Sequence, residues 1–68
     1  MGEVKVLYDQ GAGTLTVWFG NPNAEDTCEE SGDGIVLMKD KDGQVIGFER
    51  LHYHLPPQEV LEVAVETI

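Results

Sequence analysis

The sequence predicts a small α+β domain, in which an antiparallel β-meander of about four strands is covered by a short C-terminal helix. Four segments between residues 3 and 49 are rich in β-branched and aromatic residues, as strands are. The joints within the two predicted hairpins carry Asp and Gly, which are typical of tight turns. Residues 57–68 then repeat apolar side chains at helical spacing. Because the chain has 68 residues, we treat residues 1–68 as a single domain.

The first predicted hairpin joins residues 3–8 to residues 14–19 through a loop at residues 10–13. Polar and apolar residues alternate in both segments, and a shift of one residue would mix the two sides. The expected register has three central pairs: Tyr8 with Leu15, Val6 with Val17, and Lys5 with Trp18.

The second predicted hairpin joins residues 35–39 to residues 45–49 through Asp40–Gly43. A three-residue loop with Gly43 in the left-handed conformation would place Met38 opposite Ile46 and Val36 opposite Phe48. Both sides of this hairpin are apolar. We therefore expect each face of the sheet to be covered.

Two further segments complete the predicted fold. Residues 24–30 can add a short edge strand, whose acids would discourage pairing between edges. For residues 57–68, an early proline followed by acids favours a helix. The alternative is a strand, because residues 61–66 also alternate and include β-branched side chains.

Thirteen acidic and four basic residues give a net charge of −9. Nucleic acids and anionic membrane surfaces are therefore unfavourable partners, since binding phosphates requires clustered Lys and Arg. A basic protein partner or a hard cation stays compatible with the charge, and so does a role in solubility alone. No apolar run is long enough to span a membrane. The single cysteine, Cys28, and the absence of an export signal predict a cytoplasmic protein.

Self-association is the expected source of additional stability. A chain of this size buries only about 60% of the surface that its unfolded form exposes. Disulfides and structural metals usually compensate, but Cys28 has no partner within the chain and no zinc-ligand spacing is present. We therefore expect a homo-oligomer, with a dimer favoured.

Four segments carry a family resemblance: Tyr8-Asp9, Leu15–Phe19, Gly34–Leu37 and Asp40–Leu51. In this order they resemble the domain of unknown function 2283 family of small bacterial proteins. The matching segments lie between residues 4 and 51, and residues 34–49 are the most specific. The chain departs from the family pattern at Gly13 and Met38, where an acid is usual, and at Thr16, where an aromatic residue is usual. The resemblance implies a small partner protein with no established enzymatic activity. It also implies an antitoxin-like role, since some members are encoded beside toxin-like nucleases.

The leading functional hypothesis is a non-catalytic interaction protein that binds a basic partner, such as a nuclease surface. One candidate contact surface is the Lys5–Trp18 pair, in which Trp18 would anchor a partner. The alternatives are a cation–π contact between the two side chains and a partly covered, structural Trp18. The other is acidic and lies in the loop of residues 24–33. Its candidate residues are Glu25, Asp26, Glu29 and Glu30.

The alternative hypothesis is a metal- or small-ligand-binding protein. His52 and His54 would point to one side of a strand, and nearby acids would complete a site. The simpler interpretation is that both are ordinary surface residues, because no third ligand is evident. No cofactor and no enzymatic activity are predicted, because Cys28 lies among acids that raise a thiol pKa and no catalytic or phosphate-binding motif is present.

Overall fold

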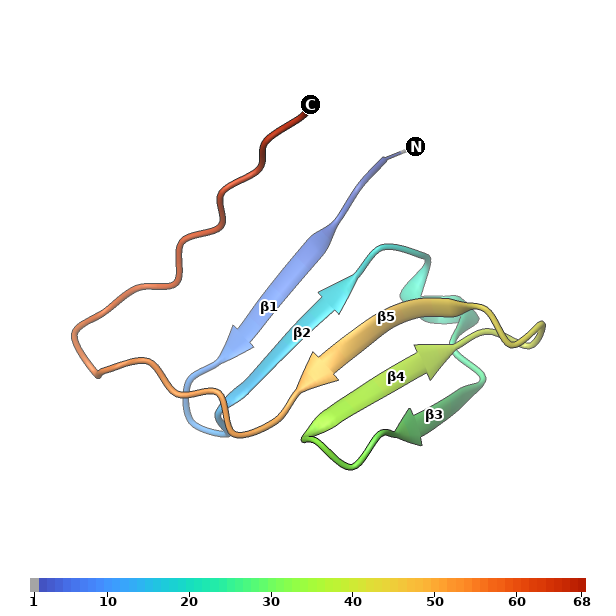
Figure 1. Ribbon diagram of the computed structural model, residues 1–68, viewed down its shortest axis with the longest axis horizontal. Coiled ribbons are helices and arrows are strands. Elements are labelled where there is room, and N and C mark those ends of the chain that lie inside the picture. The colour runs from blue at the N-terminus through green and yellow to red at the C-terminus, as the bar shows by residue number, and fades with distance from the viewer. Residues whose placement is uncertain (1) are drawn as a thin grey trace.

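The computed structural model describes residues 2–68 and shows one five-stranded antiparallel sheet (Figure 1). Among these residues the only helical element is a 3₁₀ turn, η1, at Pro22–Ala24. The predicted α+β class is therefore wrong, and the domain is all-β. The strands are β1 (Lys5–Asp9), β2 (Thr14–Trp18), β3 (Thr27–Glu30), β4 (Ile35–Lys39) and β5 (Val45–Arg50).

The strand order β1-β2-β5-β4-β3 is not a simple meander. A hairpin of β1 and β2 joins a three-stranded unit of β3, β4 and β5, and β5 lies between β2 and β4 (Figure 1). The connection after β2 crosses to the far edge of the sheet, where the additional edge strand anticipated at residues 24–30 forms as β3. The open edges are consequently β1 and β3.

The first hairpin has the predicted register. Lys5 lies opposite Trp18, Val6 opposite Val17, and Tyr8 opposite Leu15. The turn is held by the Gly13 N–H, which donates to the Asp9 carbonyl oxygen at 2.8 Å. The Ala12 N–H donates to Asp9 Oδ1 at 3.0 Å. Gly13 has φ +69°, a value that glycine adopts at little cost.

The second hairpin differs from the predicted register by one residue. Met38 lies opposite Gly47 and Lys39 opposite Val45, so Ile46 is an extra residue in a β-bulge. The Asp40 carboxylate accepts the N–H groups of Asp42 and Gln44, each at 2.9 Å, and the Asp40 N–H donates to the Gln44 carbonyl oxygen at 2.9 Å. The loop therefore spans residues 41–43 as predicted, and the bulge alone shifts the register beyond it. Gly43 does adopt the expected left-handed conformation, with φ +80°.

The segment after β5 forms neither the predicted helix nor a strand. It leads away from the end of β5 and reaches the C-terminus outside the sheet (Figure 1). A Pro56–Glu59 turn begins it, with the Glu59 N–H donating to the Pro56 carbonyl oxygen at 2.9 Å. A helix of about twelve residues is marginal in water, and the three valines of this segment favour it less than unbranched residues would. Val60 and Val65 are exposed, and Leu61 is the one half-buried residue among 57–68, so the segment has almost no packing surface to stabilise a helix.

The sheet has two unlike faces, because residues opposite each other in neighbouring strands point to the same side. We call one the apolar face, formed by Val6, Tyr8, Leu15, Val17, Ile35, Leu37 and Phe48. We call the other the mixed face, formed by Leu7, Thr16, Trp18, Val36, Met38, Gly47 and Glu49. Of the hydrophobic residues in 2–68, only Met38 and Ile46 are buried, at 4% and 9% exposure. A single layer thus leaves most apolar side chains of the strands half-buried.

Candidate functional site

Four predicted partner-binding acids gather along one open edge of the sheet. Glu29 and Glu30 belong to β3, and Glu25 and Asp26 directly precede it. We call these four residues the acidic edge, and all four are exposed. The Asp26 N–H donates to the Lys39 carbonyl oxygen at 2.8 Å, which fixes the approach to β3.

Among residues 2–68, the charge of the acidic edge is neutralised at one position only. Lys39 Nζ lies 3.0 Å from Glu29 Oε2, and both side chains project to the apolar side of the sheet. This exposed pair contributes little stability. Glu30 projects to the opposite side, because neighbouring residues of a strand alternate. Carboxylates therefore flank the outer backbone of β3 from both sides.

Cys28 lies within the acidic edge as an exposed, unpaired thiol. Its Sγ donates a hydrogen bond to Glu25 Oε2 at 2.6 Å. This bond raises the pKa of the thiol, with smaller contributions from desolvation and from the charges of Glu25 and Glu49. The arrangement favours the neutral thiol, which is the opposite of what an activated nucleophile requires.

Lys5 and Trp18 lie far from the acidic edge in the strand order. They are opposite each other on β1 and β2, and β5 and β4 separate them from β3. The Trp18 ring lies over Gly47, where a Cβ atom would come within 2.7 Å of ring carbon Cε3. Trp18 is half-buried, so the structure resembles the partly covered pair rather than an outward anchor. The predicted site residues thus form two separate groups.

The two histidines are held at different places. The His54 imidazole occupies the space beside Gly13, where a Cβ atom would overlap the ring, and the neighbouring Tyr53 N–H donates to the Gly13 carbonyl oxygen at 2.9 Å. His52 has φ +59°, and its ring lies near Gly34. Within residues 2–68, no group of three or more His, Cys, Asp or Glu side chains is arranged to hold a metal ion.

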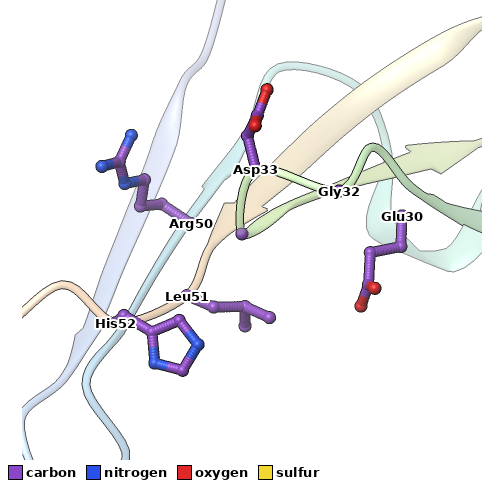
Figure 2. Close-up of a pocket in the computed structure, with 7 residues that line it drawn as sticks. Glu30, Gly32, Asp33, Arg50, Leu51 and His52 are labelled. Atoms are coloured by element: carbon purple, nitrogen blue, oxygen red, sulfur yellow. The ribbon is translucent and has the colours of Figure 1, made fainter.

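A pocket of about 440 Å³ lies where the β3–β4 turn meets the end of β5. The pairing of Ile35 with Arg50 brings residues 30–34 close to residues 50–52. Figure 2 shows that the polar side chains of this pocket diverge: the Arg50 guanidinium and the Glu30 carboxylate point in different directions. Sequence reasoning missed this grouping, since the residues are separated in sequence and only the register joins them. The arrangement offers no convergent set of catalytic groups.

The fold and its surfaces define a class of small, single-sheet β domains with an acidic edge. The chain belongs to the family described as "Protein of unknown function (DUF2283)", whose sequence profile matches residues 5–53. The match includes all five strands, and the expected family is thereby confirmed. No curated protein and no solved structure matches the chain. Within residues 2–68, no helix is long and apolar enough to cross a membrane.

Proposed function

We propose that this protein is a non-catalytic interaction domain that binds a basic protein segment along the acidic edge. The supporting observation is the position of the acids: they flank an open edge strand, all of whose residues are exposed. An open edge offers unpaired backbone N–H and C=O groups to an extended segment of another protein. Such strand addition is a common mode of peptide recognition, in which the backbone supplies affinity and the side chains supply specificity.

The acidic residues on both sides of β3 favour a partner with positive charge. A strand added beside β3 would lie between Glu29 on one side of the sheet and Glu30 on the other. Two acidic edges repel each other, so this edge disfavours pairing between copies of the chain. Lysine or arginine side chains on an added strand would instead gain complementary charge and associate faster.

The kind of partner that fits is a protein with a basic surface, such as a nuclease. The net charge of −9 supports this assignment, because the long-range field of the domain attracts basic proteins and repels nucleic acid. Binding of this kind would mask the basic surface, as an antitoxin-like subunit does. We place this interaction in the cytoplasm, which the unpaired Cys28 supports.

The test compares two variants of equal net charge in capture from an extract of the native host at low salt. The first carries Glu25→Gln, Asp26→Asn, Glu29→Gln and Glu30→Gln, and we expect it to lose most of the captured basic protein. The matched control carries the same number of neutralised acids elsewhere, at Glu3, Glu59, Glu62 and Glu66, which are all exposed. It should retain the partner. Equal capture by both variants, or no specific capture by the wild-type chain, would contradict the proposal.

A further inference from the structure

The apolar face is a surface whose burial the described residues leave incomplete. Its side chains come from β1, β2, β4 and β5, and each of them is half-buried. Antiparallel sheets normally pack one such face against a second layer. Among residues 2–68 there is no α-helix and no second sheet to supply that layer.

The chain covers only one corner of this face with its own residues. The Tyr53 ring packs edge-on against Tyr8, with ring centroids 5.8 Å apart. The Leu55 N–H also donates to the Tyr8 hydroxyl oxygen at 2.9 Å. Beyond this corner the C-terminal segment turns away, and Val63 and Val65 are 58% and 84% exposed. The described residues therefore leave the rest of this face uncovered.

The charge of the apolar face points to a second copy of the same chain. Its strand residues include two bases and one acid (Lys39, Arg50 and Glu29), so its net charge is +1 although the whole chain carries −9. The strand residues of the mixed face include one base and three acids (Lys5, Asp9, Glu30 and Glu49), a net charge of −2. Two copies can thus meet through their apolar faces with little electrostatic repulsion, whereas contact through the mixed faces would bring acids together.

The size of the face also matches a second sheet. Five strands, about 4.8 Å apart and about 17 Å long, cover about 400 Å² of flat area. Specific interfaces bury about 800 Å² of accessible surface on each partner. The contact must therefore use the whole face and reach the exposed apolar residues beside it, Val4 and Phe19. A partner of equal dimensions satisfies this requirement, and a short peptide does not.

We infer that two copies of this chain pack through their apolar faces as a two-layer β-sandwich. The interface is isologous, so each copy buries the same side chains against the other. The sheets lie about 10 Å apart, and their strands are aligned within about 30°. The acidic edge lies at the side of such a sandwich and stays accessible, so this inference is independent of the proposed function.

Sedimentation equilibrium of the full chain tests the assembly. We expect a mass of twice the 7.5 kDa of one chain, with dissociation only on dilution. A variant with Glu25→Gln, Asp26→Asn and Glu30→Gln should show the same mass, because Glu30 projects to the mixed side of the sheet and the other two residues precede β3. A folded protein with the mass of one chain up to millimolar concentration would overturn the inference and leave the proposed function intact.

Isotope-filtered NOE measurements on a mixture of labelled and unlabelled chains identify the face without any substitution. We expect intermolecular NOEs to the methyl groups of Val17 and Leu37 on the apolar face. Leu7 and Val36 are the matched controls, because they lie on neighbouring strand positions of the mixed face and should show none. NOEs confined to Leu7 and Val36, or none at any of the four residues, would overturn the inference.

Discussion

The apolar face and the mixed face cover their apolar side chains in different ways. On the mixed face, Trp18 and Met38 lie on either side of Gly47 in neighbouring strands, and the indole covers the glycine. Met38 is consequently one of the two buried hydrophobic residues. The Thr16 hydroxyl donates to Glu49 Oε2 at 3.2 Å, which satisfies the polar part of the same face. The centre of the mixed face is thus closed locally by its own side chains, whereas Leu7 on the outer strand β1 is 43% exposed.

The apolar face has no equivalent of Gly47. Its central side chains, among them Val17, Leu37 and Phe48, stand directly opposite one another across three strands, and none can fold over a gap in the sheet. Neighbouring strands cover their sides but leave their tips exposed. In the same sheet, a glycine and a large aromatic ring thus cover the centre of one face, whereas the other face requires a second layer.

Truncation of neighbouring residues in β4 should give the largest difference between the faces. In one chain Leu37 and Val36 are both half-buried, but in the sandwich only Leu37 becomes fully buried. We expect Leu37→Ala to lower the free energy of unfolding by about 2–5 kcal/mol, as buried leucines do. Val36→Ala should lower it by only about 1 kcal/mol, because the residue keeps part of its exposure. Urea unfolding at equal protein concentration measures both values.

The dependence of the unfolding midpoint on protein concentration distinguishes burial by a second copy from packing within one chain. If the second copy buries Leu37, the unfolding midpoint of the wild-type chain rises with protein concentration, and Leu37→Ala weakens that rise. Similar losses for the two variants, together with midpoints that do not change with concentration, would mean that the single sheet alone sets the stability of both faces.

Filling the space under Trp18 should lower the free energy of unfolding by less than Leu37→Ala does. A Cβ atom at Gly47 would lie 2.7 Å from Trp18 Cε3 and 2.7 Å from the Val17 carbonyl oxygen. We therefore expect Gly47→Ala to cost about 1–3 kcal/mol, as overpacked sites do. The displaced indole should also shift its fluorescence to longer wavelength.

Gly11→Ala is the matched control for this substitution. A Cβ atom at Gly11 would have Asp9 Oδ1 as its nearest neighbour, at 3.6 Å, which is an ordinary contact. Its stability and its tryptophan fluorescence should match those of the wild-type chain. If Gly47→Ala behaves in the same way, the indole does not close the mixed face as described.

The first hairpin could be predicted from sequence because its alternation is strict. Each residue of β1 and β2 has a clear polar or apolar identity, and the loop of residues 10–13 leaves one register that sorts them. The second hairpin lacks this information. Val45 and Ile46 are both apolar, so the pattern does not reveal that Ile46 is the extra residue of a bulge.

The strand order and the C-terminal segment depended on contacts between distant parts of the chain. β5 pairs with β2 as well as β4, and no local pattern encodes the first of these pairings. In residues 57–68, helical spacing and alternation coexist, and the near absence of a packing surface decided against the helix.

The candidate site was also predicted only in part. The acidic residues were found because they are contiguous in sequence, and an exposed edge strand confirmed their accessibility. The position of His54 beside Gly13 was not predicted, since it depends on how the chain leaves β5. The pocket near Arg50 was missed for the same reason.

The smallest expected effect concerns Cys28, which lies where the mixed face meets the acidic edge. Because the bond to Glu25 raises the thiol pKa, the reactive thiolate is scarce near neutral pH. Glu25→Gln removes the charge of the acceptor and weakens the hydrogen bond that is the main cause, so the thiol pKa should fall and the pH profile of iodoacetamide alkylation should move to lower pH. At a pH of about 8 the rate should rise several-fold.

Glu49→Gln should produce a smaller shift in the same direction, because the charge of Glu49 is the weakest of the four causes. Glu30→Gln is the control: Glu30 projects to the same side of β3 as Cys28 but contributes nothing to the shift. Equal shifts for Glu25→Gln and Glu30→Gln would show that the overall charge, rather than the hydrogen bond, governs the thiol.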